Sequence, residues 1–107
     1  MKTYLIMTAI SLLSSGIHAE TVQEIKANSK GWDTVTVTGT ITQQVESDKF
    51  IFKDATGEIY IKIKPYIWQQ INLANAAFNQ IYKFTAKVNK EVLPGIELDA
   101  TLINIVK

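Results

Sequence analysis

The sequence lacks cysteine and arginine, and among its 107 residues it has one histidine, His18, and two prolines. Without cysteine no disulfide can cross-link the fold, and no zinc site of the usual Cys/His type can form. If His18 is removed with the N-terminal segment, no Ser-His-Asp or Cys-His nucleophile can be assembled either. We therefore expect no enzymatic activity, no cofactor and no metal site.

The first 19 residues have the features of a secretory signal peptide. Lys2 supplies a positive start, residues 4–13 form an apolar run, and Ile-His-Ala at 17–19 is a loose small-x-small cleavage pattern. The alternative is an uncleaved anchor, but the run is too short to cross about 30 Å of hydrocarbon. We therefore expect cleavage after Ala19, a periplasmic location, and no membrane anchor on the remaining domain, residues 20–107.

Removal of this segment leaves ten lysines against ten acidic residues, and so no formal net charge. Proteins that bind nucleic acid normally carry a basic face, often rich in arginine. The charge balance therefore argues against nucleic acid as the partner. We expect a single small domain that is monomeric.

Capping signals and hydrophobic periodicity predict where the helices and strands lie. Thr21 and Glu24 form a capping-box pattern, which predicts a helix over 21–28, and Pro65 begins a second predicted helix over 65–73. A loop is expected at 75–79. Alternating apolar and polar residues predict five strands, at 34–44, 49–53, 58–64, 81–88 and 96–105.

Two strands carry irregularities. Gly39 lies in the middle of the first strand, which indicates a bend, a bulge or close approach of another backbone. In the last strand Leu98, Ala100 and Leu102 share one phase, whereas Ile103 has the other. A bulge near Leu102, or a strand end buried on both sides, would explain this change.

Five strands with a helix between the third and fourth is the element order of the OB-fold. The predicted class is therefore mainly β: a five-stranded OB-fold Greek-key barrel with a short N-terminal helix and a helix between strands 3 and 4. Another small five-stranded barrel or roll is the alternative.

The sequence also resembles the periplasmic bacterial OB-fold (BOF) family of YgiW/YdeI-type stress-tolerance proteins. The resemblance covers nearly all of residues 20–107, and its most specific part is the run 52–59. The matching residues are Val35, Val37, Gly39, Ile41, Phe50, Phe52, Asp54, Thr56, Gly57, Glu58, Ile59, Ile63 and Trp68. It implies an exported, non-catalytic OB-fold domain linked to envelope stress, without a settled ligand.

The chain departs from the family pattern at three places. Ala86 stands where the family tends to carry glycine, and Asn89 follows Val88 where an aspartate is usual. The Trp-Gln-Gly run typical of the helix ends here in Gln70. Because Asn89 carries no charge, any role that the family's aspartate has at this position is in doubt for this chain.

OB-folds usually bind ligands on the face of strands 2 and 3, between the loops that join strands 1–2 and 4–5. These loops correspond here to residues 43–48 and 89–95. Lys53, Tyr60 and Lys62, with Ile51 beside them, point outward on that face. An aromatic ring flanked by cations suits a sugar or an anionic group. The alternative is an ordinary solvated strand face.

The run Asp54, Thr56, Gly57 and Glu58 has the composition of a tight turn, in which Asp54 accepts from turn amides and Gly57 takes a positive φ. A cation site on Asp54 and Glu58 is the alternative, although two carboxylates are few for Ca²⁺.

Two further features have structural and functional interpretations. Trp32 and Trp68 are expected to plug the ends of the barrel, with stacking platforms as the alternative. Glu97 and Asp99 have the spacing of paired acid/base carboxylates, but alternating acids are common on an exposed strand, and we expect a solvated face.

These patterns favour a non-catalytic periplasmic binding or adaptor protein of envelope stress tolerance. Its partner would be an envelope glycan, an anionic small molecule or a protein, bound on the strand 2–3 face. Two alternatives remain: an OB-fold that binds single-stranded nucleic acid, and a metal-dependent enzyme that works without histidine or cysteine.

Overall fold

The computed structural model describes residues 17–73, 77, 78, 80–91 and 95–106. The elements are β1 (Ile17–Ala19), α2 (Val22–Asn28), β2 (Thr34–Gln44), β3 (Lys49–Asp54), β4 (Gly57–Lys62), α3 (Pro65–Gln69), β5 (Ile81–Asn89) and β6 (Glu97–Ile105). The five predicted strands correspond to β2–β6, and both helices lie where they were predicted. The short strand β1 was not predicted, and the loop expected at 75–79 lies mostly outside the described residues.

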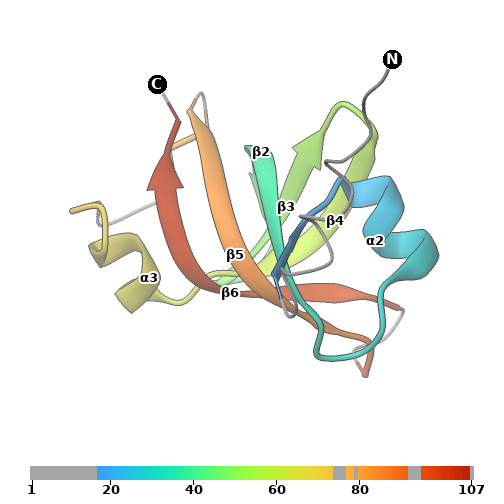
Figure 1. The fold of residues 1–107 in the computed structure, drawn as a ribbon. Coiled ribbons are helices and arrows are strands. Elements are labelled where there is room, and N and C mark those ends of the chain that lie inside the picture. The colour runs from blue at the N-terminus through green and yellow to red at the C-terminus, as the bar shows by residue number, and fades with distance from the viewer. Residues whose placement is uncertain (1–16, 74–76, 79, 92–94, 107) are drawn as a thin grey trace, which may run out of the picture.

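The strands β2 to β6 form a sheet that closes into a ring (Figure 1). Neighbours follow the order β2-β3-β4-β6-β5, and β5 pairs again with β2. All of these pairs are antiparallel except β4 with β6. The ring therefore confirms the mainly β, five-stranded OB-fold arrangement, in which the helix α3 connects the third and fourth strands of the ring.

The strand β2 joins the two halves of the ring, and Gly39 makes this possible. Residues 34–40 pair with β5, and residues 40–44 pair with β3. A Cβ atom at Gly39 would lie 2.2 Å from the carbonyl oxygen of Lys53. The predicted close approach of a second backbone at Gly39 is therefore confirmed.

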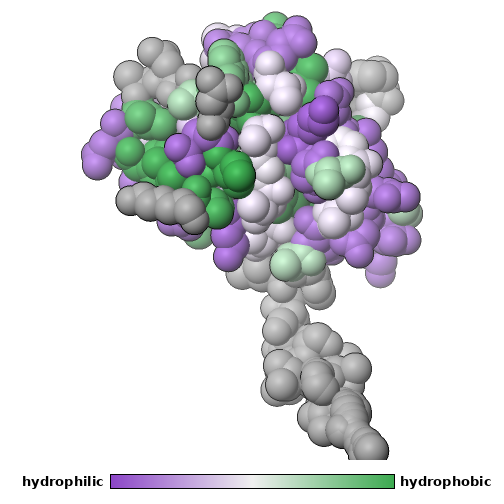
Figure 2. Space-filling view, turned by 90° about the horizontal axis from the view of Figure 1, so that it is seen from above, coloured by the Kyte–Doolittle hydropathy of each residue, from purple (hydrophilic) through white to green (hydrophobic). Residues whose placement is uncertain are grey.

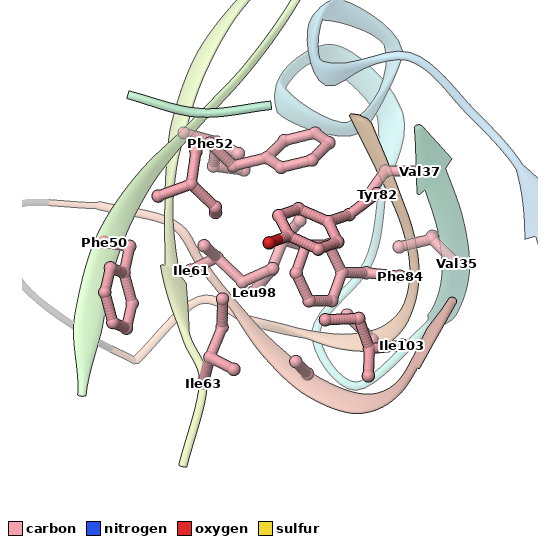
Figure 3. Close-up of a cluster of buried hydrophobic side chains, with 14 of the residues drawn as sticks. Val35, Val37, Phe50, Phe52, Ile61, Ile63, Tyr82, Phe84, Leu98 and Ile103 are labelled. Carbon is pink, nitrogen blue, oxygen red and sulfur yellow. The ribbon is translucent and has the colours of Figure 1, made fainter. Parts of the chain in front are cut away.

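The inside of the ring is a continuous apolar core (Figure 3). The Trp68 ring makes edge contacts with Phe50 and Tyr82, at centroid distances of 5.8 and 5.5 Å. Such T-shaped contacts are a favoured aromatic geometry. Buried residues of α2 and of α3 complete the core, and Figure 1 shows these helices on opposite sides of the ring.

The helix α3 is shorter than predicted, because it ends at Gln69 rather than near residue 73. The next residue, Gln70, turns its side chain toward β6. Its Nε2 donates to the carbonyl of Thr101 at 3.1 Å, and its Oε1 accepts from the amide of Ile103 at 3.0 Å. Both contacts lie at a register shift in β6, where Thr85 opposes Leu102 and the next residue opposes Ala100. The bulge predicted near Leu102 is therefore confirmed, and Gln70 satisfies its backbone groups.

Two apolar residues singled out in the sequence are exposed. Leu102 is 53% exposed because the bulge turns it outward and brings Ile103 into the core, and Trp32 is 51% exposed. The prediction that Trp32 plugs the ring is therefore wrong, whereas Trp68, at 3% exposed, is buried as predicted. Figure 2 shows that exposed apolar side chains gather toward one side of the view, while polar ones dominate the other.

Candidate functional site

The candidate site is the outer surface of β3 and β4 together with the adjoining part of β6, which we call the β3–β4 face. Residues opposite each other in neighbouring strands point to the same side of a sheet. Ile51 opposes Tyr60, and Tyr60 opposes Glu97. The outward residues of this face are Lys49, Ile51, Lys53, Glu58, Tyr60, Lys62, Glu97 and Asp99.

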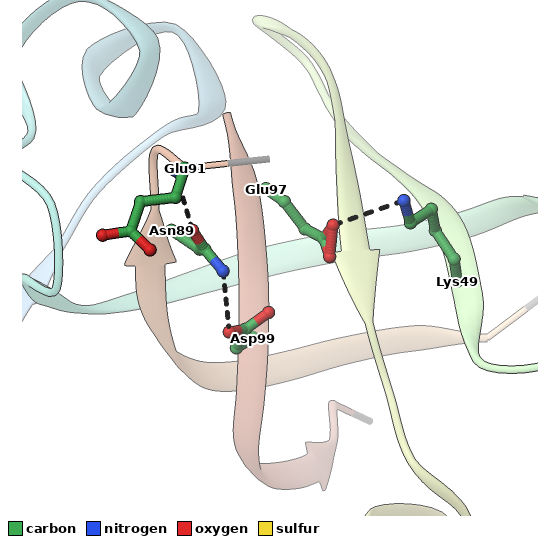
Figure 4. Close-up of polar contacts among 5 residues, drawn as sticks. All are labelled: Lys49, Asn89, Glu91, Glu97 and Asp99. Carbon is green, nitrogen blue, oxygen red and sulfur yellow. Dashed lines mark hydrogen bonds and ion pairs between the residues drawn. The ribbon is translucent and has the colours of Figure 1, made fainter. Parts of the chain in front are cut away.

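Tyr60, Lys49 and Glu97 form the centre of this face. The Tyr60 side chain is 39% exposed. The Lys49 Nζ lies 5.6 Å from the centroid of the Tyr60 ring and 3.4 Å from Oε1 of Glu97. Figure 4 shows the Glu97 side chain reaching from β6 across β4 toward Lys49. One lysine therefore links an exposed aromatic ring to a buried carboxylate.

The burial of Glu97 overturns a prediction. Glu97 was expected on a solvated strand face, but it is only 2% exposed. Its Oε1 has no hydrogen-bond partner among the described residues, and the 3.4 Å ion pair to Lys49 is too long to replace one fully. Burying a carboxylate with a single partner costs free energy. Polar groups buried at such a cost are a feature of functional sites.

Asp99 continues the polar cluster along β6. Its Oδ2 accepts from Nδ2 of Asn89 at 3.4 Å, and the Oδ1 of Asn89 accepts from the amide of Glu91 at 2.9 Å (Figure 4). The Asp99 Oδ1 is buried and has no hydrogen-bond partner among the described residues. Asn89 therefore bridges the Asp99 carboxylate and the backbone at Glu91.

A cavity of about 320 Å³ opens beside Tyr60. It lies between the β3–β4 face, the helix α2 and the start of β6, and its lining residues are Lys26, Ile51, Glu58, Ile59, Tyr60, Gly95 and Ile96. Ligand pockets of about this size are mostly apolar and have a few polar groups that orient the ligand. Here Lys26 and Glu58 supply one charge of each sign beside the apolar Ile51 and Tyr60.

The predicted binding residues share this face but are not equally placed. Lys53 opposes Glu58, close to the β3–β4 turn, whereas Lys62 opposes Lys49 and Asp99 at the other end. The cation over the Tyr60 ring is Lys49, which sequence reasoning did not single out. The alternation of β3 places Lys49 on the same face as Lys53, but only the pairing with β4 shows which lysine reaches the ring. Of the two predicted rim loops, 89–95 is described only in part.

The turn between β3 and β4 caps the helix α2. Asp54 Oδ1 accepts from the Thr56 amide at 2.8 Å, as predicted for a turn, while its Oδ2 accepts from the amide of Val22 at 2.9 Å. The Thr56 hydroxyl accepts from the amide of Gln23 at 3.0 Å. With the confirmed Thr21–Glu24 capping box, these bonds satisfy amides that a helix start leaves free. The turn thus orients the helix that borders the cavity.

Burial alone would raise the pKa of Asp54, but hydrogen bonds from the Thr56 hydroxyl and from backbone amides outweigh it and lower the pKa below its usual 3.8. Because both carboxylate oxygens accept hydrogen bonds from the chain, Asp54 is not directed toward a cation with Glu58. Gly57 has a φ of 159°, which is close to extended backbone rather than the left-handed conformation.

Within the part of the chain that the structure describes, no cluster of three or more histidine, cysteine or acidic side chains could hold a metal ion. No helix there is long and apolar enough to span a membrane.

Comparison with known proteins identifies the family. A sequence model described as "Bacterial OB fold (BOF) protein" matches residues 15–105. An uncharacterized protein of Haemophilus influenzae is 39% identical over 69 residues, which are 64% of this chain and 54% of the relative. The chain thus spans about half the length of that relative.

Solved structures agree with this assignment. The hypothetical protein ygiW from E. coli superposes with a TM-score of 0.71 at 25% identity, over 82% of this chain and 89% of that one. The telomere capping protein Ten1 from Saccharomyces pombe has a TM-score of 0.57 at 12% identity, over 86% and 81%. The second likeness concerns the fold alone. With the family match over residues 15–105, these findings show that the chain belongs to the bacterial OB-fold (BOF) family.

Proposed function

We propose that this protein is a non-catalytic binding protein of the bacterial envelope that binds a saccharide on its β3–β4 face. The observation that carries the proposal is the exposed Tyr60 ring at the edge of a 320 Å³ cavity, with Lys49 and the buried Glu97 beside it. Export to the periplasm and a role in envelope stress tolerance belong to the same proposal and rest on the N-terminal segment and the family resemblance.

The chemistry of the face suits a sugar. A tyrosine ring offers a flat apolar surface with one polar end, on which the apolar face of a sugar ring can pack. A lysine ammonium only donates hydrogen bonds and a carboxylate only accepts them, so Lys26 and Glu58, which line the cavity, together match the donor and acceptor character of hydroxyl groups. OB-folds bind oligosaccharides as well as oligonucleotides on the corresponding face.

The other candidate partners fit fewer of the side chains on this face. A single-stranded nucleic acid requires a positive groove along its phosphates, but Glu58, Glu97 and Asp99 stand among the lysines of the face. An anionic small molecule or an acidic protein would bind the lysines but would be repelled by the exposed Glu58 carboxylate at the cavity. A metal-dependent reaction would require more ligands than this face presents.

The test is a chemical-shift titration of residues 20–107 with soluble oligosaccharides prepared from envelope glycans. Binding should shift the amides of Ile51, Tyr60 and Glu97. Tyr60→Ala should weaken binding at least tenfold, which is about 1.4 kcal/mol, whereas Tyr60→Phe should retain most of it.

A matched control is available in Tyr66→Ala. Tyr66 is more exposed than Tyr60, at 60%, and lies on α3, away from the β3–β4 face. If Tyr66→Ala and Tyr60→Ala weaken binding equally, or if no envelope oligosaccharide shifts the face, the proposal is wrong. Salt-sensitive binding of single-stranded DNA at Tyr60 would identify nucleic acid as the ligand instead.

A further inference from the structure

Exposed apolar side chains gather on the outer surface of β5 and of the second half of β6, which we call the β5–β6 face. The burial of β5 alternates, so that Ile81, Lys83 and Thr85 point outward. On β6, the amide of Val106 donates to the carbonyl of Ile81 at 2.9 Å, and Leu102 opposes Thr85. Ile81, Leu102 and Val106 are all exposed, and they therefore share one surface.

The helix α3 extends this face past the edge of β6. Gln70 binds the backbone of β6 through two hydrogen bonds, and Tyr66, one helical turn earlier, is exposed. Phe78, three residues before Ile81, is exposed as well. Five of the eight large apolar side chains that are exposed among the described residues therefore belong to α3, β5, β6 or the residues that flank these strands. The apolar side of Figure 2 is the side on which α3 lies in Figure 1.

The part of the chain that forms this face carries lysines but no carboxylate. Between Glu58 and Glu91 the sequence has five lysines and no acidic residue, and no acidic residue follows Asp99. The lysines next to the exposed apolar side chains are Lys64, directly before α3, and Lys83 of β5.

Carboxylates mark one border of the face. Lys83 and Val106 line a groove of about 530 Å³ together with Glu20, Glu24 and Asp54. Each of these three carboxylates accepts a hydrogen bond from α2 or from a residue at one of its ends. They therefore serve the attachment of α2, and the face beyond the groove combines apolar and basic side chains.

The surface of an anionic lipid bilayer is complementary to this combination. Contiguous exposed apolar surface marks a site where a protein contacts a partner or a membrane. Proteins bind a bilayer surface by burying apolar side chains among the lipids and by attracting lysines to anionic headgroups. Tyrosine is enriched at this interface, because its ring is apolar and its hydroxyl is polar. Headgroup phosphates would repel a carboxylate, and the sequence places none on this face.

We propose that the β5–β6 face binds the surface of a bilayer that contains anionic phospholipids. Leu102, Ile81 and Tyr66 enter the interface, and Lys64 and Lys83 contact headgroup phosphates. In Figure 1 the strands β3 and β4 lie on the other side of the ring from α3, so the sugar site stays open when the protein is on the membrane. The inference rests on the proposed export to the envelope, but not on sugar binding.

The test uses residues 20–107, which contain the closed ring and every buried hydrophobic residue of the described core. The probes are vesicles of phosphatidylethanolamine with phosphatidylglycerol, and neutral vesicles of phosphatidylcholine. Because the chain has no cysteine, a single one introduced by Leu102→Cys can carry an environment-sensitive fluorophore. Its emission should shift to shorter wavelength with the anionic vesicles and not with the neutral ones.

Trp32→Cys with the same label is the matched control. Trp32 is 51% exposed, close to the 53% of Leu102, but its amide binds the carbonyl of Val88, at the other end of β5 from Ile81. The emission of a label at this position should not change when vesicles are added.

A charge reversal tests the role of the lysines. Lys64→Glu should weaken binding to the anionic vesicles at least fivefold, because a lysine near an anionic bilayer contributes to binding and a glutamate is repelled. The Lys64 side chain makes no capping hydrogen bond, so α3 should remain folded. Lys30→Glu, which changes an exposed lysine in the turn between α2 and β2, should have little effect.

Four results would overturn the proposal: no binding to anionic vesicles, equal binding to neutral ones, equal shifts at positions 102 and 32, or equal effects of the two lysine changes. A shift at position 102 that grows with protein concentration without lipid would also overturn it, because the occupant would then be a second copy. None of these results affects the Tyr60 titration, and a failed sugar titration leaves vesicle binding unchanged.

Discussion

Removal of the Asp54 side chain should weaken the attachment of α2 to the β3–β4 turn. In Asp54→Ala the amide of Val22 and both Thr56 donors lose their acceptor, at 2.9, 2.8 and 2.6 Å. Loss of a helix cap costs about 0.5–2 kcal/mol, and a net hydrogen bond to a charged group contributes about 1.5–3 kcal/mol. Because the turn is partly exposed, we expect the free energy of unfolding to fall by about 2 kcal/mol, which is the sum of the lower bounds of these two ranges.

For a domain of this size, about 2 kcal/mol corresponds to a decrease in Tm of roughly 10 °C. Urea unfolding followed by tryptophan fluorescence can measure it, since Trp68 is 3% exposed in the folded state and becomes solvated on unfolding. Glu46→Ala, which removes an exposed acid from the neighbouring β2–β3 turn, is the control and should change stability by less than about 0.5 kcal/mol.

The pH dependence of Asp54→Asn provides a second readout. The pKa of Asp54 is lower in the folded protein than its usual 3.8, so the ionised carboxylate stabilises the fold. This contribution is fully present above the unfolded-state pKa and is lost as the pH falls through the folded-state pKa. The stability difference between wild type and Asp54→Asn should therefore be largest near neutral pH and shrink below about pH 4. A difference that is constant from pH 7 to pH 3, or an unchanged stability of Asp54→Ala, would refute this reasoning.

Three further predictions concern the ring and the polar cluster, each measured by urea unfolding. Gly39→Ala should cost about 3 kcal/mol or prevent folding, since its Cβ would lie 2.2 Å from a backbone oxygen; a loss below about 1 kcal/mol would contradict the close approach. Lys49→Met should cost about 3 kcal/mol by leaving Glu97 buried and unpaired, and adding Glu97→Gln should recover most of it. Gln70→Ala should cost about 2 kcal/mol through its two bonds to the β6 bulge, whereas Gln69→Ala should have little effect.

The local features followed from the sequence alone because they depend on residues close together in the chain. The capping box at Thr21, the alternation of β2–β6 and the β3–β4 turn at Asp54 are of this kind. The element order also predicted the closed ring, and Gly39 predicted the close approach of a second backbone to β2. These inferences succeeded because strand periodicity and turn chemistry are local properties.

Only the tertiary structure decided which outward side chains are covered. Alternation predicts the side of the sheet on which Glu97 and Leu102 lie, but it does not show which residues neighbour them there. Glu97 is buried beside Lys49, which is distant in sequence, and Leu102 is exposed because the β6 bulge reverses its phase. The partner of the Tyr60 ring, the cap that Asp54 provides to α2 and the edge that β1 fills likewise depend on contacts between distant segments, which periodicity does not encode.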